Sequence, residues 1–301
     1  MNGIAAGLVI AGLGVVLGVT PSWGGPPNPT ASDEVGNTAG GTGALEAITS
    51  SAFANTAFGF NALLSNTGGG YNTASGRVAL FSNTTGGLNL YAVEHGIKLG
   101  AKLVWMPTFS SRNHLDHHRK DEHFKDKFPQ TKKRMIEPTP LTVLDPKGKL
   151  LPEVGPILDL VAESDIVLSS GHLHISEIWP LFEEAKRRGV KRLLCNHPTY
   201  VVDATHDDIR RLVGMGVYVE HSVCMFIPGS KFKFYDPPEL DALIEAGTVE
   251  RTILGSDLGQ QGNPRLVDGF RNVIETCLDL GYEEAQIRRL VSSNAAELVG
   301  I

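Results

Sequence analysis

The arrangement of hydrophobic and polar positions changes twice along this chain. Residues 3–19 form an apolar, glycine-rich run, and a stretch rich in Gly, Asn and Thr follows as far as residue 88. From residue 89 onward, short apolar runs alternate with amphipathic stretches of helical length. We therefore expect an apolar leader (1–25), a repeat segment (26–88) and a globular module (89–301).

Strands that alternate with helices are typical of a parallel sheet with crossover helices. In the globular module, the pattern predicts five strands, at residues 102–108, 165–170, 191–195, 217–223 and 251–254. It predicts helices at residues 92–100, 152–162, 176–188, 205–215 and 237–246, with Ser176 as the cap of the third. The expected fold is α/β: a partial (β/α) TIM-like barrel with parallel strands, preceded by a short β-rich repeat segment.

The repeat segment shows a fixed period. Residues 55–63 and 72–80 align with a 17-residue step, and residues 37–45 fit as an earlier copy with one extra residue. Such a period predicts short strands and tight turns stacked as a solenoid. The segment resembles the repeats of bacterial adhesin heads and phage tail fibres. A polar low-complexity linker is the alternative interpretation.

The apolar run at residues 3–19 has the length of a signal-peptide core rather than that of a full membrane span. No Lys or Arg precedes it in the sequence, and no clear cleavage site follows. Two readings remain open, an export signal or anchor and a leader without a targeting role. The globular module is expected to be cytoplasmic, or exported if residues 3–19 act as a signal.

Charge and cysteine content exclude several classes of function. The net charge is −6 and the sequence pI is about 5.9, so we expect no nucleic-acid partner and no clear membrane partner. The three cysteines are an odd number and lack a C-x-x-C spacing, which argues against a disulfide framework and a thiolate zinc knuckle. All ten histidines lie in the globular module.

Polar side chains gather at the carboxyl ends of the predicted strands, where β/α barrels carry their active sites. The candidates there are His172, His197, Glu220, His221 and Asp257. Imidazole and carboxylate groups together suit zinc, with manganese or iron as alternatives. Asp257 could accept a proton from a metal-activated water. Glu220 and His221 should point to opposite faces of their strand, so only one can face the barrel interior.

Two further histidines are possible additional ligands. His174 lies two residues after His172 and could equally begin the next helix. His114 lies in a charged, histidine-rich insertion, residues 112–134, that we expect to be a solvated loop or lid. His114 is the possible exception in that insertion because it closely follows the strand that ends near Thr108.

Five short motifs occur in order in the module: Gly86 to Asn89, Gly100 to Thr108, Ser169 to His172, Cys195 to Pro198 and Leu254 to Asp257. Together they resemble an uncharacterised family of amidohydrolase-type metal-dependent hydrolases, over residues 88–301. The resemblance implies metal-binding roles for His172 and His197, at the ends of the fifth and sixth barrel strands. It likewise implies that role for Asp257, at the end of the eighth.

The sequence departs from that family at its start. The family's first strand ends in His-x-His, and no such motif precedes His172. By this count the first three barrel strands have no counterpart, and the repeat segment stands in their place. We therefore expect at most one weakly bound divalent ion and little hydrolysis of simple amides or lactones.

Two functions follow as hypotheses. The first is a metal-dependent hydrolase that cleaves an amide, ester or lactone-like bond of a small-molecule substrate with a metal-activated water, its activity impaired by the missing strands. The second is a surface or fibre-type structural protein with a catalytically inactive hydrolase-like module. A homo-oligomer formed through the repeat or through an open barrel edge fits either hypothesis.

Overall fold

The structure, a computed structural model, describes residues 38–40, 56–58, 73–75, 88–120, 139–259 and 262–301. The chain forms two compact units, residues 1–100 and 101–301, which we describe separately. The predicted leader, with the apolar run at residues 3–19, lies outside the described residues. No helix of the described part has the length and apolar character needed to cross a membrane.

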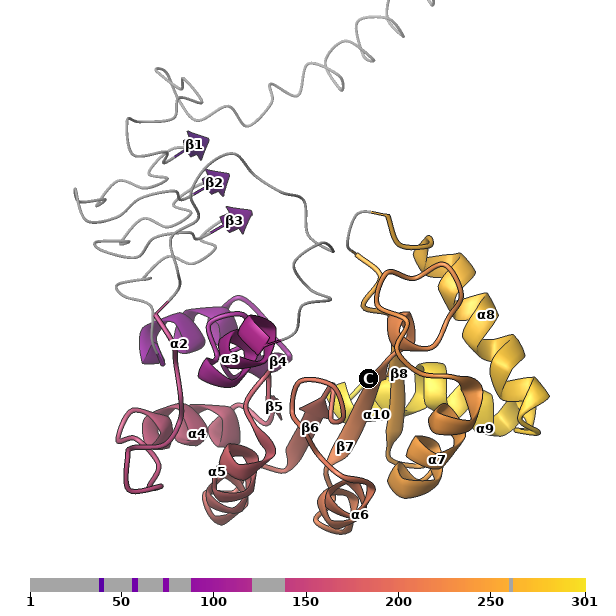
Figure 1. Ribbon diagram of the computed structural model, residues 1–301. Coiled ribbons are helices and arrows are strands. Elements are labelled where there is room, and N and C mark those ends of the chain that lie inside the picture. Colours follow the sequence, from indigo (N-terminus) through magenta and orange to yellow (C-terminus); the bar gives the residue numbers. More distant parts are fainter. Residues whose placement is uncertain (1–37, 41–55, 59–72, 76–87, 121–138, 260–261) are drawn as a thin grey trace, which may run out of the picture. The chain divides into compact units, whose positions relative to one another are not determined.

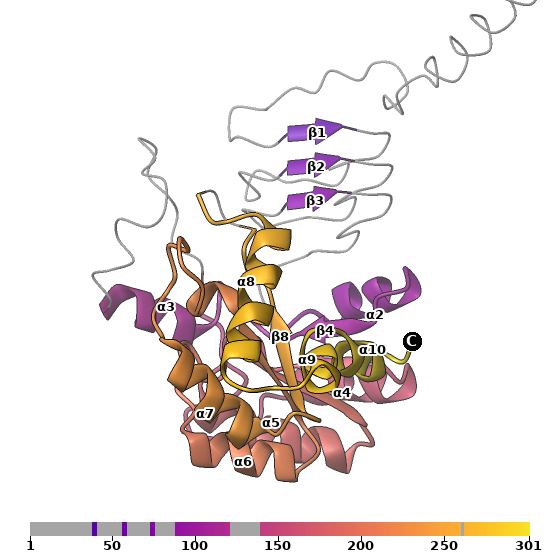
Figure 2. The ribbon, with the colours of Figure 1, turned by 90° about the vertical axis from the view of Figure 1, so that its right-hand side faces the viewer.

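The described residues of the first unit form three very short strands and one helix. The strands β1 (Thr38–Gly40), β2 (Thr56–Phe58) and β3 (Thr73–Ser75) form a parallel ladder, with Ala39, Ala57 and Ala74 as Cα partners (Figure 2). This register is the one that the sequence repeat predicts, since equivalent residues of successive copies pair. The helix α2 (Leu90–Lys98) begins at Asn89, whose side chain accepts a hydrogen bond from the Ala92 backbone N–H.

The second unit is built on a five-stranded parallel sheet (Figure 1). Its strands are β4 (Leu103–Trp105), β5 (Val167–Ser169), β6 (Arg192–Asn196), β7 (Tyr218–Ser222) and β8 (Thr252–Gly255), paired in sequence order. This confirms the predicted partial barrel with parallel strands. Consecutive strands are neighbours and parallel, which is the strand order of a β/α barrel wall.

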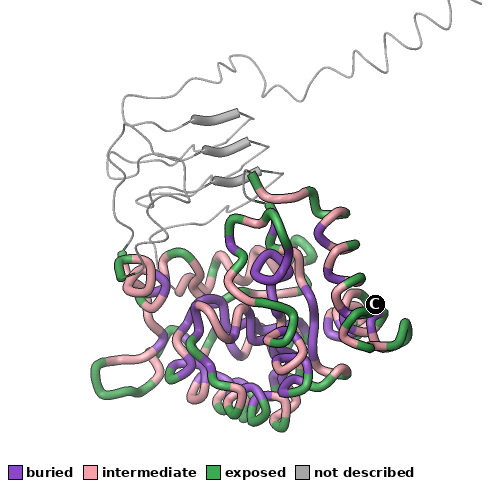
Figure 3. Tube along the Cα trace, turned by 45° about the vertical axis from the view of Figure 1, so that its right-hand side comes forward, coloured by how far each residue is buried: buried purple, intermediate pink, exposed green. Residues whose placement is uncertain are grey.

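Helices connect these strands and close the chain. They are α3 (Arg112–Lys120), α4 (Val154–Glu163), α5 (Ile175–Arg187), α6 (His206–Gly214), α7 (Pro237–Gly247), α8 (Leu266–Asp279), α9 (Glu284–Arg288) and α10 (Asn294–Val299). A 3-10 turn (Val223–Met225) follows β7, and a π-helical turn (Arg289–Ser293) precedes α10. Buried residues are concentrated along the strands and the sides of the helices that face them (Figure 3).

Two predictions about local structure were wrong. The histidine-rich insertion is not a loop over its first part, because residues 112–120 form α3; residues 121–138 lie outside the described residues. The cap of α5 is His174 and not Ser176, since the His174 ring accepts a hydrogen bond from the Ser176 backbone N–H. Thr205 caps α6 through a reciprocal bond with Asp208, which agrees with the predicted start at residue 205.

The inner face of the sheet carries an apolar layer at its base. Because side chains alternate along a strand, one residue from each strand faces inward at each level. The base layer consists of Val167, Leu194, Tyr218 and Ile253, with Leu298 of α10 packed against it. Arg192 holds this helix in place by donating to the backbone oxygens of Glu297 and Leu298, where a cation is favourable at a helix carboxyl end.

A polar layer lies above the apolar one on the same inner face. The Asn196 side chain accepts a hydrogen bond from Ser169 and donates to Glu220 at 3.1 Å. Gly255 of β8 faces Glu220 so closely that a Cβ atom there would lie 2.2 Å from the carboxylate oxygen Oε1. These contacts join β5, β6, β7 and β8 directly below the strand ends that carry the candidate site.

Candidate functional site

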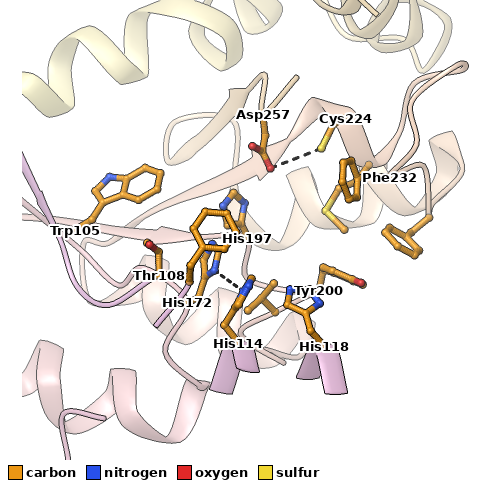
Figure 4. Close-up of a pocket in the computed structure, with 14 residues that line it drawn as sticks. Trp105, Thr108, His114, His118, His172, His197, Tyr200, Cys224, Phe232 and Asp257 are labelled. Carbon is orange, nitrogen blue, oxygen red and sulfur yellow. Dashed lines mark hydrogen bonds between the residues drawn. The ribbon is translucent and has the colours of Figure 1, made fainter. Parts of the chain in front are cut away.

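The candidate site is a pocket of about 160 Å³ at the carboxyl ends of the strands (Figure 4). His172, His197 and Asp257 all line it, and they follow β5, β6 and β8 by one to three residues. His114 of α3 lines the same pocket. The structure therefore brings the three principal predicted residues and one possible additional residue together, while their binding of a metal stays a prediction.

Backbone and side-chain hydrogen bonds and a neighbouring imidazole hold His172 in position. Its backbone N–H donates to the Pro107 oxygen at 3.0 Å, and its own carbonyl oxygen accepts from the side chains of Ser111 and Asn113. The Nδ1 atoms of His172 and His114 lie 2.8 Å apart. One ring must donate and the other accept in this contact. When His172 donates through Nδ1, its Nε2 carries the electron pair that a metal ion needs, whereas the opposite direction would place a proton on Nε2.

His197 is oriented by a hydroxyl and a carboxylate. Its Nδ1 lies 2.6 Å from the Ser222 hydroxyl oxygen and 3.6 Å from the Glu220 carboxylate oxygen Oε2. A nearby carboxylate favours the tautomer with the proton on Nδ1, which leaves Nε2 as the free electron pair. His172 and His197 lie with their ring centroids 5.1 Å apart.

Two of the predicted ligands have a strained backbone. His197 and Asp257 both have φ near +44°, the left-handed region that disfavours residues other than glycine. Such strain costs on the order of 1–3 kcal/mol and recurs at active sites, although Asp165, Asp203 and Thr248 also have a positive φ outside the pocket. The bend directs each side chain out of its strand and into the pocket, where Asp257 lies 3.8 Å from the Cys224 sulfur that donates to it.

The other predicted candidates lie elsewhere. The structure places His174 at the amino end of α5, with Asp203 3.5 Å from its ring. Glu220 is on the inner face but does not line the pocket; it acts on His197 from below. His221 is buried on the opposite face of β7, as the alternation rule predicts, and its Nε2 has no hydrogen-bond partner within the described part.

Several pocket residues were missed by the sequence reasoning. The aromatic side chains of Trp105, Phe109, Tyr200 and Phe234 line the pocket, as does His118. His118 follows His114 by four residues, and their ring centroids are 3.9 Å apart. A helical reading of residues 112–120 would have placed these two histidines on one face. The aromatic residues come from separate connections, and no spacing in the sequence groups them.

The described cysteines are buried, and none is a reactive thiolate. Burial raises the pKa of the Cys195 thiol to about 12, and it raises that of Cys224 further, with the Asp257 carboxylate as a second cause. A neutral thiol is a poor nucleophile. The chemistry of the site therefore depends on its imidazoles and its carboxylate.

Burial keeps three histidines neutral. It lowers the pKa of His172 to about 2, with the positive charge of a protonated His197 as the next cause, and it lowers those of His114 and His221 to about 3. Neutral imidazole is the form that binds a metal ion. The electrostatic state of the pocket at neutral pH thus suits a cation.

These pKa shifts predict that the protein loses stability in mild acid. The unfolded chain binds protons to these histidines near pH 6.5, whereas the folded chain does not until about pH 3, so the free energy of unfolding should fall as pH decreases through this window. Each histidine contributes at most about 1.4 kcal/mol per pH unit. Urea unfolding of the chelator-treated protein, followed by circular dichroism between pH 7 and 5, measures the slope before most carboxylates titrate.

The variant His221→Gln provides a control for this prediction, because it removes the one of the three groups that lies outside the pocket. In this variant the free energy of unfolding should change less steeply with pH, because one proton fewer is taken up on unfolding. A free energy of unfolding that does not change between pH 7 and 5 would contradict the assignment of three buried neutral histidines.

The fold and the strand-end site together define the second unit as a partial TIM-like β/α barrel. A family model described as "Family of unknown function (DUF6282)" matches residues 42–220, more than half of the chain, and the chain belongs to this family. The search of curated proteins found no match.

Solved structures with a similar arrangement include members of the amidohydrolase group. An amidohydrolase from Pseudomonas aeruginosa matches at 12% identity and a TM-score of 0.45, covering 81% of this chain and 71% of the other. An amidohydrolase from Burkholderia multivorans with bound zinc matches at 13% identity and a TM-score of 0.40, covering 70% and 87%.

The same Burkholderia multivorans enzyme with bound HEPES matches at 13% identity and a TM-score of 0.38, covering 50% of this chain. This chain spans 58% of that structure. Similarities at these TM-scores say nothing about the function of this chain. The comparisons lend no support to a likeness between residues 37–88 and adhesin heads or tail fibres, which stays a prediction.

Proposed function

We propose that the chain is a metal-dependent hydrolase that cleaves a C–N or C–O bond in a small-molecule substrate. The observation that carries this proposal is the meeting of His172, His197 and Asp257 in one pocket. His197 and Asp257 do so with a strained, left-handed backbone. Strain of this kind at two strand ends of one pocket is readily explained by a role in binding or catalysis.

The residue types fit one divalent ion. Two imidazoles that each have Nδ1 engaged by a neighbour, together with one carboxylate, are a ligand set that zinc accepts, with manganese or iron as alternatives. As placed, however, no three His, Cys, Asp or Glu side chains of the described residues form a group that could enclose an ion. We therefore propose weak binding of a single ion, with small side-chain adjustments.

The residues around this ion have separable tasks. A divalent ion would supply a water molecule activated near neutral pH. His172 and His197 would hold the ion through Nε2, and Asp257 would complete the set and accept a proton from the attacking water. Glu220 and Ser222 orient the His197 ring through Nδ1. The aromatic side chains of the pocket would exclude bulk water from the reacting bond.

The alternative function is a surface or fibre-type structural protein with an inactive module. Only the three-strand ladder of β1, β2 and β3 favours it. The pocket favours the hydrolase, because a purely structural module has no need of strained, converging polar residues. Export through residues 3–19 and assembly into a homo-oligomer both stay predictions.

Metal content tests the proposal directly. The full chain, incubated with zinc and then freed of excess by gel filtration, should retain up to one zinc per chain by mass spectrometry. His172→Ala and His197→Ala should each lower the zinc affinity at least about tenfold. Removing a group that only hydrogen-bonds to a metal ligand already has an effect of about that size, and loss of the ligand itself should have a larger one. His174→Asn is the matched control, because His174 is close in sequence but outside the pocket and asparagine also caps helices.

The outcomes separate clearly. A zinc content that is the same in His172→Ala, His197→Ala and His174→Asn would contradict a metal site in this pocket. Two tightly held ions per chain, or rapid hydrolysis of simple amides, would contradict the expectation of one weak site.

A further inference from the structure

The pocket has a large apolar and aromatic wall beside its polar groups. Six hydrophobic side chains contribute to it: Trp105, Phe109, Val201, Met225, Phe232 and Phe234. Tyr200 and Phe234 stack with ring centroids 4.5 Å apart and an interplanar angle of 23°. None of these side chains would bind the metal ion or move a proton in the proposed hydrolysis. Exclusion of water alone does not explain why so many of them are aromatic.

The size of the cavity suits one ring. Its volume of about 160 Å³ is comparable to that of an engineered apolar cavity that binds benzene, roughly 150 Å³. Phe109 lies beside the histidines, with its centroid 5.0 Å from that of His114 and 6.0 Å from that of His172, both edge-on. A ring bound in this pocket would meet aromatic edges and faces at the separations that aromatic pairs prefer.

The charge of the pocket indicates an uncharged ligand. Of the described residues that line it, Asp257 is the only carboxylate, and none is Lys or Arg. A bound carboxylate would therefore face Asp257 without a protein cation to offset the repulsion and the desolvation. A neutral amide or ester group avoids both penalties, and it can hydrogen-bond to imidazole and hydroxyl groups at the rim.

We propose that this pocket binds a neutral aromatic amide or ester, with its six-membered ring against the aromatic wall and its carbonyl group toward His172, His197 and Asp257. The binding of a ring is inferred from the aromatic side chains of the pocket alone. The placement of the carbonyl group rests on the proposed hydrolase function. Aromatic side chains flank the polar groups, with Trp105 on one side of His172 and His197 and Phe232 on the other (Figure 4).

Binding of simple probes to the full chain tests this inference without any turnover. Benzamide, benzoate and acetamide are compared by ligand-observed saturation-transfer NMR titration at pH 8, in EDTA and again with one equivalent of zinc. We expect benzamide to bind at least about tenfold more tightly than acetamide, because burying a ring adds well over 1.4 kcal/mol. In EDTA we expect the same margin over benzoate, for the electrostatic reason given above.

A matched pair of variants locates the ring. Phe109→Ala should weaken benzamide binding by about fivefold, whereas Tyr91→Ala should leave it unchanged. Both side chains are about equally exposed, at 66% and 61%, so neither truncation should disturb folding, and Tyr91 lies on α2, outside the pocket.

Each outcome decides one point. Acetamide binding as tightly as benzamide, or equal affinities in Phe109→Ala and the unaltered chain, would overturn the ring site. Benzoate binding as tightly as benzamide in EDTA would overturn the neutral class. Failure of zinc to bind, with benzamide binding intact in EDTA, would remove the proposed hydrolase function and leave the ring site standing.

Discussion

Replacing Gly171 by alanine is expected to lower the free energy of unfolding by about 3 kcal/mol, the sum of a backbone cost and a steric cost. Gly171 has φ +58°, where alanine is disfavoured, and an added Cβ would lie 2.3 Å from the Met106 carbonyl oxygen and 2.7 Å from that of Pro107. Both oxygens belong to the backbone and cannot rotate away as a side chain could. The segment after β4 and the segment after β5 must therefore move apart. His172, the next residue, would then move away from Pro107 and from His114.

Gly148→Ala is the matched control for this change. Gly148 also has a positive φ, +77°, but a Cβ added there would have nothing within 4 Å, so only the backbone cost of about 1 kcal/mol applies. Urea unfolding monitored by circular dichroism measures both variants. Equal losses of stability in the two variants would show that the strands at Gly171 are not packed as closely as described.

The strand order and the helix pattern could be predicted from the sequence because burial dictates both. Strands such as β6 are short apolar runs followed by a polar turn, and each helix presents an apolar face to them. The strand ends then determine where polar chemistry can gather, which is why the sequence alone points to His172, His197 and Asp257. Their convergence follows from parallel strands that end at one edge.

The remainder of the pocket could not be predicted, because its residues meet only through tertiary packing. Phe109 follows β4, Tyr200 follows β6 and Phe232 follows β7, so more than thirty residues separate any two of them. The polarity of residues 112–120 suggested a loop, yet His114 is buried there against His172. A polar segment can be a helix when its few buried groups are satisfied by partners distant in the sequence.

The direction of Glu220 was the one point that the alternation rule left open and the register decided. Asn196 and Glu220 are Cα partners on adjacent strands, and Ile253 of the base layer is the partner of Glu220 across the next pair. Glu220 therefore faces inward and His221 outward. The sequence could not distinguish a Glu220 that binds the metal from a Glu220 that orients a metal-binding histidine. The distance from the Glu220 carboxylate to His197 Nδ1 favours the orienting role.

Replacing Asp257 is expected to separate stability from function in the proposed metal site. Asp257→Gly removes both the carboxylate and the left-handed strain at φ +44°. Relief of this strain should raise the free energy of unfolding by up to about 1 kcal/mol, reduced by the greater freedom of glycine in the unfolded chain. Zinc affinity should nevertheless fall at least about tenfold, because one of three ligands is gone.

Asp203→Gly is the matched control, since Asp203 also has a positive φ, +62°, but its side chain is 83% exposed and lies outside the pocket. It should show the same small change in stability with no loss of zinc. Asp257→Asn completes the set: asparagine tolerates the left-handed backbone and keeps the shape of the side chain, so stability should hold while zinc affinity falls. Urea unfolding and zinc titration of the three variants give both quantities. A stabilised Asp257→Gly chain that still binds zinc like the unaltered protein would show that the strained carboxylate serves the fold and not the metal.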